Sequence, residues 1–119
     1  GVATMPLATA KLSNLPVAPR KVRLVAAMIR GKRVADAMDI LQFTVKRCAE
    51  PMRKLLASAA ANAEHAAREQ RQRINTDDMI VRSVTVNDGR TMYRYLPMPR
   101  GRAGRVRHRS SHIEIVISD

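Results

Sequence analysis

Cysteine and aromatic residues are scarce in this chain, and their scarcity excludes several kinds of site. Cys48 is the only cysteine, there is no tryptophan, and aromatic residues make up 3% of the sequence. One cysteine excludes an internal disulfide and fits a reducing compartment, and no Cys/His cluster has the spacing of a zinc site. With so few rings, a base-stacking platform of the kind that many single-strand binders use is not expected.

Long apolar runs are also missing. No stretch of the sequence approaches the roughly 20 residues that a membrane-spanning helix needs. The opening residues "GVATMPLATA" lack the charged start and long apolar core of a signal peptide. We therefore expect a cytoplasmic protein of one domain, residues 1–119, with no membrane partner.

Acidic residues are few relative to basic ones. The chain carries 22 Lys and Arg against 10 Asp and Glu, for a net charge of +12 and an isoelectric point near 11.4. Such an excess predicts a polyanionic partner, of which nucleic acid is the commonest and an acidic membrane surface the main rival. Arginine dominates the basic set, and its planar fork suits phosphate oxygens and base edges.

The basic charge is concentrated between Asp88 and Glu114, a segment with no carboxylate. It holds seven arginines: Arg90, Arg94, Arg100, Arg102, Arg105, Arg107 and Arg109. The rest of the segment allows two interpretations. It is either a disordered basic loop or a structured arm, and the arm is favoured because Tyr93, Tyr95, Leu96 and Val106 interleave with the arginines.

Three helices are predicted from apolar spacing of three and four residues. They cover 20–30, about 33–42 and 45–67, with Pro19 in the first turn of the first helix and Thr44 capping the third. Pro51 lacks an N–H group and predicts either a kink or a late start of the third helix. The apolar stripe of the third helix and the expected core methionines are Val45, Cys48, Ala49, Met52, Leu55, Leu56, Ala59, Ala60, Ala63, Ala66, Ala67, Met28 and Met38.

Strands are predicted at 8–14, 79–87 and 112–118, where apolar and polar residues alternate or β-branched residues cluster. With the helices they indicate an α+β domain with a small antiparallel sheet. Two reversals of the chain remain open. Asp88-Gly89 would pair 80–87 with 90–96, whereas a turn within 97–104 would pair 80–96 with 103–118 and leave Asp88-Gly89 as a bulge at the base of an arm.

Three blocks of the sequence carry a resemblance to a known family. "APRKVRLVAAMIRGKRVADAMDIL", "LLASAAANAEH" and "GRAGRVRHRSSHIEIVISD" closely resemble the bacterial large-subunit ribosomal protein L-twenty-two family, in the right order and over nearly the whole chain. The resemblance implies three helices packed on a three-stranded antiparallel sheet, with a long β-hairpin arm at about 89–111. It implies a structural role in the large subunit, with the arm running between rRNA segments and its tip lining the peptide exit tunnel.

The resemblance also implies site residues. The expected rRNA-binding residues are Arg20, Lys21, Arg23, Arg90, Arg94, Arg100, Arg102, Arg105, Arg107, Arg109 and His112. The expected tunnel-lining tip consists of Met92, Tyr93, Arg94, Met98, Pro99, Arg100, Gly101 and Arg102. The implied partners are large-subunit rRNA, neighbouring ribosomal proteins and the nascent peptide, with no homo-oligomer, cofactor, metal or catalytic residue.

The remaining polar residues allow more than one interpretation. The cations Lys32, Arg33, Lys46, Arg47, Arg53 and Lys54 fit an ordinary solvated face as well as an RNA contact, and Arg68, Arg71 and Arg73 are expected to face solvent. A hydrolase would require His112 to act with Glu114, which has no companion ligand. A DNA-bending arm of the HU type is the other class, and it would require a dimer.

Overall fold

The computed structural model describes residues 7–90, 92–97 and 103–119. In this part of the chain the helices are α1 (Pro19–Ile29), α2 (Val34–Phe43), α3 (Ala49–Glu69) and the short 3-10 helix η1 (Thr76–Asp78). The strands are β1 (Leu7–Leu15), β2 (Ile80–Asp88), β3 (Met92–Pro97), β4 (Ala103–His108) and β5 (Ser111–Ser118). The α+β class and all three predicted helices are confirmed.

The body contains a three-stranded antiparallel sheet in the order β1-β5-β2. The last strand of the chain therefore lies in the middle, between the first strand and the strand that follows the helices. Ile113, Ile115 and Ile117 of β5 are buried, and they alternate with half-buried residues as the sequence predicts. Ile115 stands opposite Ala10 on one side and Val84 on the other.

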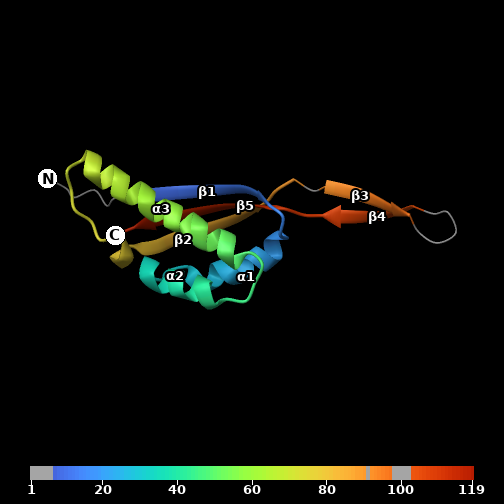
Figure 1. Ribbon diagram of the computed structural model, residues 1–119, viewed down its shortest axis with the longest axis horizontal. Helices are drawn as coiled ribbons and strands as arrows, with labels where there is room; N and C mark the ends of the chain where they lie inside the picture. The colour runs from blue at the N-terminus through green and yellow to red at the C-terminus, as the bar shows by residue number, and fades with distance from the viewer. Residues whose placement is uncertain (1–6, 91, 98–102) are drawn as a thin grey trace.

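The helices bury their apolar faces against this sheet (Figure 1). In α1 the side chains of Val22, Val25 and Ile29 are inaccessible to solvent, and α1 packs against β2. In α3 small residues such as Ala59 and Ala63 are buried, and α3 packs closely on β1 and β5. Small side chains allow this close approach of helix and sheet.

The third helix starts later than the predicted boundary at Val45. It begins at Ala49, which places Pro51 within the first turn, where the missing N–H costs no helical hydrogen bond. Of the two outcomes expected for Pro51, the late start is the correct one. The predicted cap is wrong because Thr44 ends α2 instead, and its hydroxyl donates to the carbonyl of Ile40. Val45, outside the helix, is 96% exposed rather than part of the core.

Most of the predicted core is buried, with three exceptions. Cys48 and Met52 are buried as predicted, and Met38 and Ala60 are partly buried against the core. The exceptions are Val45, Ala66, which is exposed, and Met28, which is 45% exposed. Met28 and Ala66 lie on the apolar stripes by spacing, but no neighbouring element covers their side of the helix.

The chain reverses at the far end of an arm and not at Asp88-Gly89. β2 pairs with β5 as far as Asp88 opposite Ser111, and β3 then pairs with β4 from Met92 opposite His108 to Pro97 opposite Ala103. Three residues, 89–91, join β2 to β3, whereas two, 109–110, join β4 to β5. The register therefore shifts by one residue between Asp88 and Met92, as the bulge or bend predicted at the base of the arm requires. The paired strands β3 and β4 favour the arm over the disordered-loop interpretation.

The arm extends away from the body, with no helix beside it (Figure 1). The principal extents are 72 × 26 × 18 Å and the radius of gyration is 18.1 Å. A compact chain of this length would have a radius of gyration of about 13.5 Å. The excess reflects a hairpin that projects from a small body.

Candidate nucleic-acid interface

The arm brings arginines from both of its strands into one ladder. In the register of β3 and β4, Tyr93 stands opposite Arg107, Tyr95 opposite Arg105, and Arg94 opposite Val106. Met92 and Tyr93 lie at the body end of this ladder rather than next to the tip. The predicted tip residues Met98, Pro99, Arg100, Gly101 and Arg102 fall outside the described residues, so their role stays a prediction.

The base of the arm is fixed by backbone contacts between its two limbs. The N–H of Gly89 donates to the carbonyl of Ser110 at 2.9 Å, and the Ser110 hydroxyl donates to the carbonyl of Arg90 at 2.6 Å. A Cβ atom at position 89 would lie 2.5 Å from the Ser110 Oγ and 3.2 Å from the Ser110 carbonyl carbon, so a larger residue here would push the Ser110 hydroxyl away from the carbonyl of Arg90. The side chains of Arg90 and Arg109 are exposed at this junction.

Arg23 of α1 and Arg30, the residue that follows α1, lie along the outer edge of the sheet. Arg23 donates to the carbonyl of Val86 at 3.0 Å, and Arg30 donates to the carbonyl of Val84 at 2.7 Å. β2 is an edge strand, and these guanidinium groups satisfy carbonyls that would otherwise be open to pairing with another chain. Arg23 was predicted to bind rRNA; one of its N–H groups is used within the protein, and the residue remains exposed.

Arg20 and Lys21 lie beside two cations from a distant part of the sequence. Together with Lys46 and Arg47, just before α3, they line an open groove of about 660 Å³. All four residues are exposed. We call this feature, lined by residues of 17–24 and 45–48, the basic groove. Sequence spacing did not indicate that Lys46 and Arg47 would join Arg20 and Lys21.

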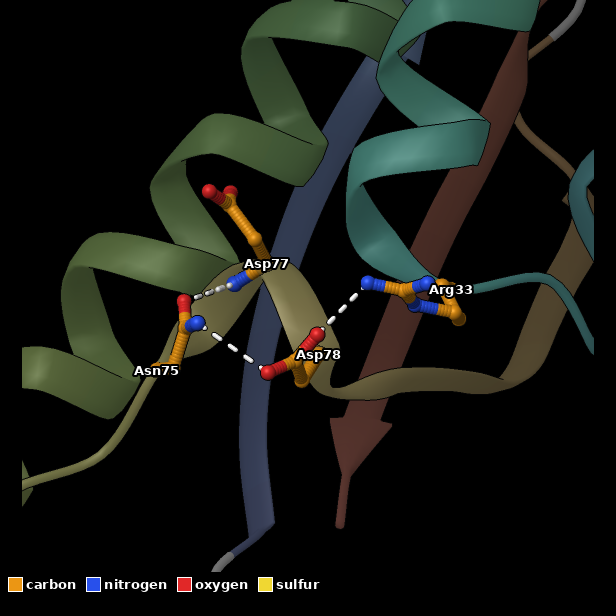
Figure 2. A network of polar contacts seen from close by, with 4 residues as sticks. All are labelled: Arg33, Asn75, Asp77 and Asp78. Carbon is orange, nitrogen blue, oxygen red and sulfur yellow. Dashed lines mark hydrogen bonds and ion pairs between the residues drawn. The ribbon is translucent and has the colours of Figure 1, made fainter.

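Other cations are paired with acids and are less free to bind an anion. Arg33 contacts Asp78 at 2.6 Å, and Asp78 also accepts from the Asn75 amide at 3.0 Å (Figure 2). The Asn75 side chain accepts from the backbone N–H of Asp77 at 3.2 Å, which completes the turn that precedes β2 (Figure 2). This network joins the start of α2 to η1.

A second ion pair lies in the first turn of α3, where Arg53 contacts Glu50 at 2.5 Å. The hydrogen bond from Arg53 holds the pKa of Glu50 below its ordinary value. Of the six cations that the sequence left undecided, Arg33 and Arg53 are therefore held in ion pairs, whereas Lys46 and Arg47 line the basic groove.

The residues of the alternative hydrolase site have structural partners. The Nδ1 atom of His112 accepts the backbone N–H of Asn14 at 3.1 Å, and Glu114 pairs with Lys11 at 3.4 Å. Asn14 has a φ of 59° and lies where the register of β1 shifts, so His112 stabilises an irregular part of the strand. In the described ranges, no group of three His, Cys, Asp or Glu side chains has an arrangement that could hold a metal ion.

Positive charge is concentrated at the end of the body from which the arm projects. α1 begins at this end, next to the segment that precedes α3, whereas α3 ends and η1 lies at the opposite end (Figure 1). The opposite end has mixed charge, with Glu64 and Glu69 of α3 and the two aspartates of η1 near the exposed Arg68, Arg71 and Arg73. The basic groove, whose lining includes no carboxylate, and the exposed Arg90 and Arg109 at the arm base therefore lie at one end of the body, an arrangement that suits a polyanionic partner.

A family model described as "Ribosomal protein L22p/L17e" matches residues 10–118, which include every described helix and nearly all of the sheet. The chain belongs to this family. It is a family of structural proteins of the large ribosomal subunit, not of enzymes, and its members associate with rRNA and with other ribosomal proteins. The resemblance in the three sequence blocks is thereby confirmed.

The family also agrees with the class of partner that the charge predicted. Membership supports RNA binding and a place in translation over the membrane-surface alternative. Among the described helices, none is long and apolar enough to cross a lipid bilayer. The individual contacts with rRNA expected of His112 and of the arm and α1 cations stay predictions.

Proposed function

We propose that this protein binds and organises large-subunit rRNA during assembly of the ribosome, with the arm of about 89–111 as its main RNA-contacting element. The observation that carries this proposal is the projecting β3–β4 hairpin, in a segment with seven arginines and no carboxylate. An isolated two-stranded hairpin is only marginally stable in water, so an arm of this length gains from a surrounding partner. Large-subunit rRNA supplies the phosphates that its arginines match.

The finer assignments rest on the family resemblance. The tip, about residues 98–102, would reach the wall of the peptide exit tunnel, where the nascent peptide passes. The protein acts there as a cytoplasmic monomer within the ribosome and catalyses no reaction. The HU-type alternative needs two arms to grip duplex DNA from both sides, so a monomer that prefers folded rRNA to duplex DNA distinguishes the two proposals.

The proposal is tested by measuring how affinity for transcribed large-subunit rRNA changes with salt. Replacing Arg105 and Arg107 with Ala removes two arm cations and should lower the slope of log affinity against log salt by about one to two units. The matched control replaces Arg71 and Arg73, two exposed cations between α3 and η1, at the opposite end of the body. This control variant has the same net charge as the variant that lacks Arg105 and Arg107.

Equal losses of slope in the two double variants would show that the arm is not the interface and that net charge alone sets the affinity. Tighter binding of the wild-type chain to duplex DNA than to rRNA would favour the DNA-bending alternative. Assembly into the particle is checked independently. Large subunits reconstituted without the chain should take up one copy of it per particle when it is added back.

A further inference from the structure

The basic groove combines cations with exposed apolar side chains. Besides its four cations it is lined by Val17, Leu24, Val45 and Cys48. Leu24 is 65% exposed and Val45 is 96% exposed, so the groove presents hydrocarbon directly to solvent. Apolar surface of this kind, rimmed by polar groups, marks a binding site more often than isolated exposed residues do.

The charge of the groove defines the chemistry of an occupant. Arg20, Lys21, Lys46 and Arg47 all carry positive charge, and no carboxylate is among the lining residues. The ion pairs that neutralise cations elsewhere in the body, at Arg33 and Arg53, do not involve these four. An occupant should therefore be anionic and should also have an apolar face that displaces water from Leu24 and Val45.

The dimensions favour a single-stranded nucleotide over a duplex. A volume of about 660 Å³ lies within the roughly 300–1,000 Å³ of sites that take one small molecule. An unstacked base offers a flat face for aliphatic carbons and for the planar guanidinium groups of Arg20 or Arg47, and its flanking phosphates offer charge to the lysines. The start of α1 and the segment before α3, whose residues line the groove, lie at the end of the body from which the arm projects (Figure 1). An RNA that follows the arm would pass there.

We infer that the basic groove holds an unpaired rRNA nucleotide, with its base against Leu24, Val45 and the guanidinium of Arg20 or Arg47, and its flanking phosphates against the remaining cations. This inference rests on the proposed function and adds a second RNA site, on the body, that reads an unstacked base. The arm would then supply charge-based affinity, and the groove would fix the orientation of the body on a single-stranded segment.

The test separates apolar contact from charge. Replacing Leu24 and Val45 with Ser leaves every cation in place, and both side chains are exposed enough for the fold to persist. Affinity for transcribed large-subunit rRNA should fall about tenfold, in line with a contact to one base, while the salt slope stays at the wild-type value. The matched control replaces Met28 and Phe43 with Ser, two exposed apolar residues (45% and 77%) that do not line the groove.

A complementary variant removes charge only. Replacing Lys46 and Arg47 with Gln should lower the salt slope by about one to two units. Chemical probing of the rRNA should show an unpaired base that the wild-type chain protects and the Leu24→Ser, Val45→Ser variant does not. If that double variant fails to fold, the single substitution Val45→Ser, at a 96% exposed site, gives the same readouts.

Two results would overturn the inference while leaving the proposed function intact. One is rRNA binding by the Leu24→Ser, Val45→Ser variant that equals that of the Met28→Ser, Phe43→Ser control. The other is unchanged rRNA affinity together with loss of a neighbouring protein from reconstituted subunits, which would assign the groove to an acidic protein segment. Failure of the wild-type chain to bind rRNA at all would instead overturn the proposed function.

Discussion

Two adjacent serines at the junction of arm and body allow a test of how burial changes the contribution of a hydrogen bond to the free energy of unfolding. Ser111 donates to the carbonyl of Val17 at 2.6 Å, and Ser110 donates to the carbonyl of Arg90 at the same distance. The environments differ. Ser111 is fully buried, and its bond joins β5 to the connection between β1 and α1, whereas Ser110 is partly exposed.

The expected magnitudes follow from what replaces each bond. Ser111→Ala leaves a carbonyl next to the core without a donor and should lower the free energy of unfolding by about 2 kcal/mol. In Ser110→Ala, water can reach the freed carbonyl of Arg90, so the loss should stay near 0.5 kcal/mol. For a chain of this length, a loss of 2 kcal/mol corresponds to a fall in Tm of about 6–12 °C.

The assay is equilibrium unfolding of the isolated chain in urea, followed by far-ultraviolet circular dichroism because the sequence contains no tryptophan. The midpoint should fall strongly for Ser111→Ala and slightly for Ser110→Ala, with the dependence on urea unchanged in both. Equal shifts for the two variants, or no shift for Ser111→Ala, would refute the link between burial and bond strength at this junction.

Two further predictions concern the arm and the groove. Deleting residues 98–102 should leave the Tm of the body unchanged within about 2 °C. The reason is that the body sheet ends at Asp88 and Ser111, and a change far from the core has little effect on stability. A clearly lower Tm would show that the body depends on the complete arm. Cys48 is 2% exposed and burial raises the pKa of its thiol, so alkylation by iodoacetamide at pH 8 should be far slower in the native chain than in urea. Rapid alkylation of the native chain would contradict this burial. Because the pKa of the thiol is raised in the folded chain, the free energy of unfolding should fall as the pH rises past the ordinary thiol value of 9.0.

Local patterns were sufficient for most of the secondary structure. The spacing of Val22, Val25 and Ile29 predicts α1, and the alternation of Ile113, Ile115 and Ile117 predicts β5, because each element has to turn one apolar face to a core. Helix ends were predicted less well. Apolar spacing alone extended α3 back to Val45, although the proline at position 51 already indicated a later start.

The candidate interface was only partly predictable. The cluster of arginines between Asp88 and Glu114 is visible in the sequence, and so are Arg20 and Lys21. Their meeting with Lys46 and Arg47 is not, because it depends on how α1 and the segment before α3 pack. The ion pair between Arg33 and Asp78 is equally hidden, since 44 residues separate its partners in the sequence.

The sequence by itself determined the charge, the class of partner, the types of the helices and strands, and the family blocks, because these depend on composition and on neighbours a few residues apart. Local patterns left open where the chain reverses, since Asp88-Gly89 and the segment 97–104 are both acceptable turns locally, and the family resemblance implied an arm. The tertiary structure decided between the two turns. Pairing β5 with both β1 and β2 buries three isoleucines in the centre of the sheet, and an early hairpin at Asp88 would have displaced β5 from β2. That long-range burial is the physical reason the arginines project as an arm.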